Sequence, residues 1–175
     1  MIVDFDLLRV LCKLQDHLLD AGAVETIVAG GAIRDMLLGR PIKDIDVYYV
    51  GDLDPYKLSV FEKKETPSVE DYEGVEFKVS HPHLTMEGCS YPIQLMKVEI
   101  PLGQLDEWIL DTFDCNLSKV GFGEHLEISQ QFLDDVEMEM MTFPKPVSEK
   151  YMKKMTDKYP DYIVNGEVKP DDFDF

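Results

Sequence analysis

Residues 28–47 read VAGGAIRDMLLGRPIKDIDV, and this stretch carries the strongest structural signal in the chain. The short apolar run over 25–29 predicts a buried strand, which the Gly30–Gly31 pair ends. Residues 32–38 predict a two-turn helix that closes at Gly39, and residues 43–50 alternate as a half-buried strand does. The sequence therefore predicts a strand, a helix and a second strand in close succession.

Two carboxylates lie on the second predicted strand. Side chains alternate along a strand, so Asp44 and Asp46 point to the same face, about 7 Å apart at Cα. Two such groups repel each other unless a cation lies between them. Mg²⁺ prefers oxygen ligands and commonly bridges carboxylates to substrate phosphates, and two ions ~3.5–4 Å apart fit such a site. The spacing therefore predicts Asp44 and Asp46 as metal ligands.

The glycine pair is the second part of the predicted site. Without Cβ atoms, the backbone at Gly30 and Gly31 can approach a phosphate closely, and the helix that follows directs its first N–H groups there. Taken singly, Asp-x-Asp is usually a solvated face and Gly-Gly is usually a turn, and no Gly-Lys-Ser/Thr follows as in a P-loop. The joint spacing makes the stretch specific, although Arg34–Asp35 also fits a simple surface ion pair.

The segment GGAIRDMLLGRPIKDID resembles the head-domain motif of the nucleotidyltransferase superfamily, in the branch of poly(A) polymerases and CCA-adding enzymes. The resemblance covers about residues 25–50. Ten residues match the pattern in order: Gly30, Gly31, Arg34, Asp35, Leu37, Leu38, Gly39, Arg40, Asp44 and Asp46. The resemblance implies an α/β (α+β) fold with a mixed, mostly antiparallel sheet flanked by helices. It also implies Mg²⁺- or Mn²⁺-dependent transfer of a nucleoside monophosphate from an NTP.

The resemblance also implies roles for individual residues. Asp44 and Asp46 are the expected metal ligands and catalytic carboxylates, and the glycine pair is expected to contact the triphosphate. The residues assigned to nucleotide binding are Gly30, Gly31, Arg34, Asp35 and Lys43.

Members of this superfamily often add a third carboxylate from a later strand. We favour Asp114, in TFDCNLSKVGF, over Glu99 as a third ligand or base, because Phe113 and Asn116 fit a later motif of the family in part. Gln94 holds another position for such a group, and a neutral amide there would leave two carboxylates. The segment around Phe113 and Asp114 also resembles the corresponding strand of stand-alone, often phage-borne, members of the superfamily.

The composition restricts the partners. The 175 residues carry a formal net charge of −18, which argues against a long nucleic-acid footprint because such binding depends on phosphate neutralisation. Solubility alone also explains this charge, and a metal-bridged nucleotide remains compatible with it. The three cysteines form no CxxC pair and neither a signal peptide nor a membrane span is found, so we expect a cytoplasmic protein of a bacterium or phage-infected cell.

The rest of the chain predicts a nucleotidyltransferase domain over 1–143, followed by a lysine-bearing C-terminal helix and an acidic tail over 144–175. Further helices are expected over 4–20, 54–65, 102–110 and up to about 141, and strands over 75–80, 92–99, 115–122 and 126–129. The lysines at 150–158 fit a solvated helix face better than an RNA contact.

The sequence thus predicts a small Mg²⁺-dependent nucleotidyltransferase that binds an NTP. The 3′ end of an RNA such as tRNA is the favoured acceptor, bound weakly or through a partner, with a protein or small-molecule hydroxyl as alternatives. Two other functions remain open. One is a catalytically inactive relative that binds nucleotide, and the other is an acidic protein that mimics nucleic acid and inhibits an enzyme.

Overall fold

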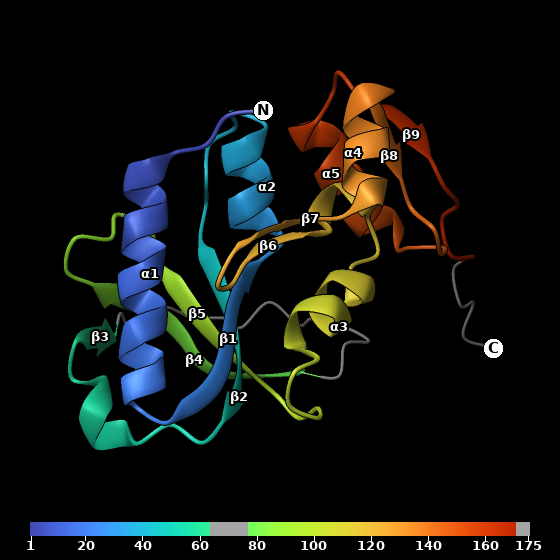
Figure 1. The fold of residues 1–175 in the computed structure, drawn as a ribbon. Coiled ribbons are helices and arrows are strands. Elements are labelled where there is room, and N and C mark those ends of the chain that lie inside the picture. The colour runs from blue at the N-terminus through green and yellow to red at the C-terminus, as the bar shows by residue number, and fades with distance from the viewer. Residues whose placement is uncertain (64–76, 171–175) are drawn as a thin grey trace.

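A computed structural model describes residues 1–63 and 77–170, which form one seven-stranded sheet, a two-stranded sheet and five α-helices (Figure 1). The large sheet has the order β3-β4-β5-β2-β1-β6-β7, and its β2–β5 pair is parallel whereas the others are antiparallel. This confirms the predicted mixed, mostly antiparallel sheet. Its strands are β1 (Ala23–Ala29), β2 (Ile45–Gly51), β3 (Phe61–Lys63), β4 (Phe77–Met86), β5 (Ile93–Val98), β6 (Val120–Phe122) and β7 (Leu126–Ile128).

Helix α1 (Phe5–Asp20) lies where the sequence predicts a helix, and it begins at an N-cap. The Asp4 carboxylate accepts the backbone N–H groups of Asp6 and Leu7, each at 3.0 Å. Gly22 follows the helix with a φ of +116°, a conformation that favours glycine. The apolar stripe of the helix, with Leu11, Leu14 and Leu18 fully buried, packs on the sheet.

The predicted strand–helix–strand unit is present as β1, α2 (Gly31–Leu37) and β2. Strands β1 and β2 are antiparallel neighbours, with Val28 opposite Val47. Gly39 has a φ of +65° and ends α2, as the sequence predicts. The two halves of the glycine–carboxylate stretch are therefore brought to the centre of the sheet.

The sheet has a different apolar cluster on each face. Helices α1 and α2 cover one face, where Ile45 and Val47 of β2 are fully buried. Helix α3 (Leu105–Thr112) packs on the other face, beside Tyr48 of β2 and Met96 of β5. Successive residues of β2 therefore belong to opposite faces, as a pleated strand requires.

Two predictions in the middle of the chain were wrong. In place of a helix over 54–65, a 3₁₀ turn over Pro55–Leu58 leads into β3, where the buried Phe61 pairs with Met86; residues 64 and 65 lie outside the described residues. Pro55 suits the first turn of a helix, but a helix that continued to residue 65 would not place Phe61 in the strand position where its ring is buried. Likewise, β6 is shorter than the predicted strand, because the chain forms a 3₁₀ turn over Asn116–Ser118 before it.

The predicted strands over 75–80 and 92–99 correspond to β4 and β5, although residues 75 and 76 lie outside the described residues. Strand β4 runs on to Met86, through a segment with two register shifts against β5. The residue His83 has a φ of +53° at this irregularity. His81 and His83 therefore lie in a bulged strand.

The C-terminal elements lie together beside α2 and away from α1 (Figure 1). They are α4 (Gln130–Glu137), β8 (Met140–Thr142), α5 (Glu149–Lys158) and β9 (Ile163–Asn165), with β8 and β9 paired in parallel. Helix α4 stops earlier than predicted because Met140–Thr142 form β8 instead. Phe143, Met155 and Tyr159 belong to the same apolar cluster as α1 and α2, and the division at residue 143 stays a prediction. In the described part of the chain, no helix is long and apolar enough to cross a membrane.

Candidate active site

The turn between β1 and α2 has no room for a side chain at Gly30. Its φ is +78°, and a Cβ there would lie 2.9 Å from Cζ of Phe113. The Gly30 N–H donates to the carbonyl of Val120 at 2.9 Å, and its carbonyl accepts the N–H of Arg34 at 2.9 Å. Glycine is therefore required for the turn to join β1, α2 and β6.

Asp46 lies in β2 next to this turn. One residue beyond the Val28–Val47 pair, the antiparallel register brings Ala29 beside Asp46, and Gly30 follows directly. Asp44 immediately precedes the strand. Because Ile45 and Val47 are buried against α1 and α2, alternation places Asp46 on the other face, with Tyr48.

The chain leaves one oxygen of the Asp46 carboxylate without a partner. Its Oδ1 is buried and accepts no hydrogen bond. Burial raises the pKa of Asp46, the nearby Asp44 carboxylate raises it further, and Lys154, Lys43 and Arg34 lower it, which leaves the pKa at about 7. The Lys43 ammonium lies 3.9 Å from Asp44 Oδ2. The effect of Asp44 on the pKa of Asp46 shows that the two carboxylates repel each other, as their spacing predicts.

This carboxylate pair fits a divalent cation. A cation would give Asp46 Oδ1 the partner that it lacks and would remove the repulsion from Asp44. Within residues 1–63 and 77–170, no three His, Cys, Asp or Glu side chains form a group that could hold a metal. An ion bound here would therefore take other ligands from water and phosphate, as Mg²⁺ commonly does.

The candidates for a third acidic residue lie in different places. Gln94 is the direct neighbour of Asp46 across the parallel β2–β5 pair. Glu99 follows the end of β5 and is exposed. Asp114 is exposed on the segment after α3, where it adds to a rise in the pKa of Tyr151 that is chiefly due to burial. The role of Asp114 as a ligand or base stays a prediction.

Arg34 and Asp35 form a buried network, not the simple surface ion pair that was the alternative. Arg34 Nε donates to Asp35 Oδ1 at 2.9 Å, and the two side chains are 8% and 2% exposed. Asp35 also accepts hydrogen bonds from the Tyr159 hydroxyl and the Lys158 ammonium. Arg34 donates to Ser118 Oγ at 2.8 Å. We call these five residues the α2 network.

The α2 network links the motif helix to the C-terminal end of α5. Burial by itself would lower the pKa of Arg34, but Tyr159 and Asp35 raise it above its ordinary value. Sequence reasoning missed Ser118, Lys158 and Tyr159, which lie 84 to 125 residues away from Arg34 or Asp35 along the chain. No local pattern marks such partners, because their contact arises from the packing of α5 on α2.

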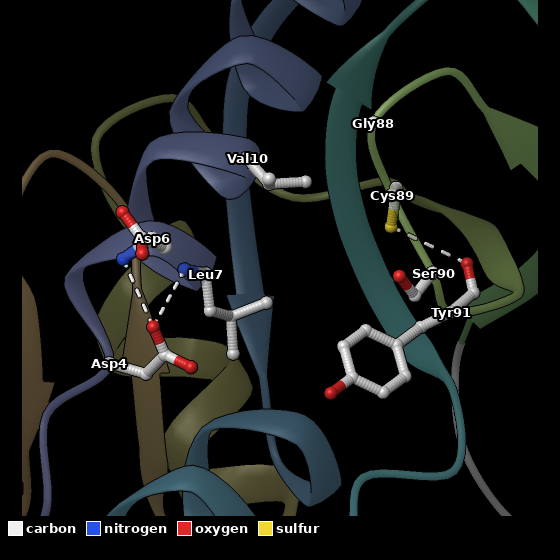
Figure 2. Close-up of a pocket in the computed structure, with 8 residues that line it drawn as sticks. All are labelled: Asp4, Asp6, Leu7, Val10, Gly88, Cys89, Ser90 and Tyr91. Carbon is white, nitrogen blue, oxygen red and sulfur yellow. Dashed lines mark hydrogen bonds between the residues drawn. The ribbon is translucent and has the colours of Figure 1, made fainter.

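A surface hollow lies elsewhere, between the first turns of α1 and the connection from β4 to β5 (Figure 2). Its lining residues are Asp4, Asp6, Leu7, Val10, Gly88, Cys89, Ser90 and Tyr91. Cys89 and Tyr91 pack against the cluster under α1, so the hollow opens on the face opposite to Asp46. No predicted site residue lines it.

Comparison with known proteins gives a match at the level of structure. No protein-family model matches the sequence, and no curated protein matches it. A CCA-adding enzyme solved with ATP has a TM-score of 0.61 at 14% identity, over 93% of this chain and 40% of that one. The Bacillus stearothermophilus CCA-adding enzyme with CTP has a TM-score of 0.54 at 14% identity, and the match covers 95% of this chain and 42% of that one. The Thermotoga maritima CCA-adding enzyme with tRNA has a TM-score of 0.53 at 17% identity, and the match covers 79% of this chain and 33% of that one.

These comparisons set the extent of the likeness. The chain spans about two fifths of the first two solved structures and one third of the third. Identities this low establish the fold alone. The chain has the nucleotidyltransferase fold of the head domain of CCA-adding enzymes.

Proposed function

We propose that this protein is a Mg²⁺-dependent nucleotidyltransferase that transfers a nucleoside monophosphate from an NTP to an acceptor hydroxyl. The single observation that carries the proposal is the buried Asp46 Oδ1, which accepts no hydrogen bond and lies beside a second carboxylate. A buried acceptor without a partner destabilises the folded protein by about 1–3 kcal/mol, so a bound cation offers a physical reason for its presence.

The chain supplies the binding groups. Asp44 and Asp46 would hold the ion, and Lys43, next to Asp44, would contact the nucleotide. The Gly30–Gly31 turn, adjacent to Asp46 in the sheet, would let the triphosphate approach the backbone. Arg34 and Asp35 would act by positioning α2, because their side chains already bind each other and α5.

The chemistry is an in-line displacement at the α-phosphate, in which the acceptor oxygen bonds to the phosphorus while the bond to the β-phosphate breaks and pyrophosphate leaves. When bound, the metal neutralises the phosphate oxygens and makes the phosphorus easier to attack. Asp46 must be ionised to hold a cation, and with its pKa at about 7 it releases a proton on binding near neutral pH. Asp114 is the proposed base that accepts the proton of the attacking hydroxyl.

An RNA 3′ end is the first candidate for the acceptor. Its support is the likeness to the Thermotoga maritima enzyme, whose structure contains tRNA. The net charge of −18 works against a long RNA contact and favours a short acceptor segment. Protein and small-molecule hydroxyls are the alternatives.

A nucleotide-binding protein without transferase activity is the second candidate function. Gln94 favours it, because this neutral amide lies beside Asp46 where a further carboxylate would meet the same cation. Two carboxylates hold an ion more weakly than three.

The test is to incubate the purified protein with each labelled NTP, Mg²⁺ or Mn²⁺, and RNA or protein acceptors. Label transfer that Asp44→Asn or Asp46→Asn abolishes would support the enzyme. Metal-dependent NTP binding without transfer to any acceptor would support the second candidate. Absence of both would contradict the proposal and would favour an acidic nucleic-acid mimic.

A further inference from the structure

The C-terminal helix carries positive charge in an otherwise acidic protein. Residues 144–170 contain six lysines and four acidic residues, although the whole chain has a net charge of −18. Four of these lysines lie at positions 150–158, on or at the end of α5. This helix therefore repels phosphate less than the acidic chain as a whole does.

Helix α5 is fixed in its position against α2. At its end, Lys158 and Tyr159 donate hydrogen bonds to the buried Asp35 carboxylate. One turn earlier, the Met155 sulfur accepts a hydrogen bond from Arg34 at 3.6 Å. Met155 and Tyr159 are fully buried. The face of α5 that carries these side chains is therefore held against α2 by contacts to both charged residues of that helix.

Lys154 lies at the edge of this anchored face. It is adjacent to Met155 and four residues before Lys158, so it projects on the side of α5 that is turned toward α2. Its side chain is exposed, yet its charge acts on Asp46: burial and Asp44 raise the pKa of Asp46, and Lys154 is the strongest of the cations that lower it. Lys154 therefore lies on the face of α5 whose Met155 and Lys158 contact Arg34 and Asp35, and its exposed ammonium acts on Asp46.

The neighbouring lysine has different surroundings. Lys153 Nζ lies 2.9 Å from Asp157, one turn along the same helix, and both side chains are well exposed. The pair lies on the outer side of α5, and Lys153 has no resolved influence on Asp46. Lys153 and Lys154 thus carry the same charged group, but Lys153 pairs with Asp157 whereas Lys154 acts on Asp46.

We propose that Lys154 binds the phosphate chain of the nucleotide, at the site where Asp44 and Asp46 would hold a divalent cation. The inference rests on the proposed nucleotidyltransferase function and adds a binding group from the C-terminal helix to that site. A lysine ammonium is a compact charge on a flexible stem, which suits contact with a phosphate chain that changes its position during the reaction. The α2 network, by fixing α5, positions this lysine.

The test compares Lys154→Ala with the matched control Lys153→Ala. Dissociation constants for an NTP and for the corresponding NMP are measured by titration calorimetry with Mg²⁺ present. We expect Lys154→Ala to weaken NTP binding by about 10- to 100-fold, as the loss of a charge-assisted hydrogen bond does, with a much smaller effect on NMP. Lys153→Ala should bind both as the wild type does, and Lys154→Arg should recover part of the NTP affinity.

Three outcomes would overturn the inference. Lys154→Ala could bind NTP as tightly as Lys153→Ala, it could weaken NTP and NMP equally, or it could weaken only the binding of an RNA acceptor. A urea titration of each variant checks that folding is unchanged. If the wild type binds no NTP in the presence of Mg²⁺ or Mn²⁺, the proposed function itself fails, which is distinct from a wild type that binds NTP without help from Lys154.

Discussion

The same motif contributes two clusters of charged side chains, and they differ in whether the chain supplies a hydrogen-bond partner for each buried carboxylate oxygen. In the α2 network, Asp35 accepts hydrogen bonds from Arg34, Tyr159 and Lys158. In the Asp44–Asp46 pair, a carboxylate oxygen is buried without a donor, and the two acids repel each other. In the first cluster every charged group has a partner from the chain, whereas in the second the chain leaves one carboxylate oxygen without a donor, which the proposed cation would supply.

This difference separates two roles that the sequence motif does not distinguish. A buried ion pair with satisfied hydrogen bonds is stable by itself and holds elements together. A buried acceptor without a partner lowers the free energy of unfolding, and a bound ligand that partners it would restore that stability. Removing one charge should therefore have opposite effects on the free energy of unfolding in the two clusters.

The largest expected effect is a loss of stability in Asp35→Asn. The substitution leaves Arg34 buried without its counter-charge, which typically lowers the free energy of unfolding by about 3–5 kcal/mol. Urea unfolding monitored by circular dichroism measures this change. The control is Asp161→Asn, which removes the partly exposed ion pair with Arg40 and should lower stability by less than about 1 kcal/mol. Equal effects of the two substitutions would contradict the structural role of the α2 network.

The next effect is a pH-dependent gain of stability in Asp46→Asn. The pKa of Asp46 rises from 3.8 to about 7 on folding, so between these values the native state holds a proton that the unfolded chain has lost. Stability from this group is therefore full below about pH 4 and is lost as the pH rises through 7, by on the order of 2–4 kcal/mol in the metal-free protein. The asparagine variant lacks this loss.

The measurement is the free energy of unfolding of wild type and Asp46→Asn from pH 4 to pH 8 in the presence of a chelator. The difference between the two proteins isolates Asp46 from the other acids of the chain. Mg²⁺ should stabilise the wild type at pH 8 and have little effect on the variant. A difference that does not change with pH would show that Asp46 titrates normally and would remove the contrast with the α2 network.

The smallest effect concerns the turn between the two clusters. Gly30→Ala places a Cβ 2.9 Å from Phe113 at a φ of +78°, so we expect a loss of about 1–3 kcal/mol in the free energy of unfolding. Gly31→Ala is the matched control, because its Cβ would lie at an ordinary 3.6 Å from Arg34. Thermal unfolding of both variants distinguishes them. If Gly31→Ala were the more destabilised, the assigned geometry of the turn would be wrong.

Much of the fold could be predicted because its signals are local. The cap at Asp4, the apolar period of α1 and the glycines that end α1 and α2 act within a few residues, and the corresponding elements are where we expected them. Predictions failed where packing outweighed local preference. Phe61 was predicted in a helix but lies in the edge strand β3. Residues Met140–Thr142 form β8, which pairs with β9, beyond the end of the acidic helix.

The glycine turn and the paired acids follow from sequence alone, because backbone freedom and strand alternation are properties of short segments. What completes each cluster follows from tertiary structure. Asp35 meets Lys158 and Tyr159, and Asp46 meets Gln94 and the field of Lys154, only because α5 packs on α2 and β5 pairs in parallel with β2. Contacts between residues so distant in the chain depend on the packing of whole elements, and no short segment encodes them.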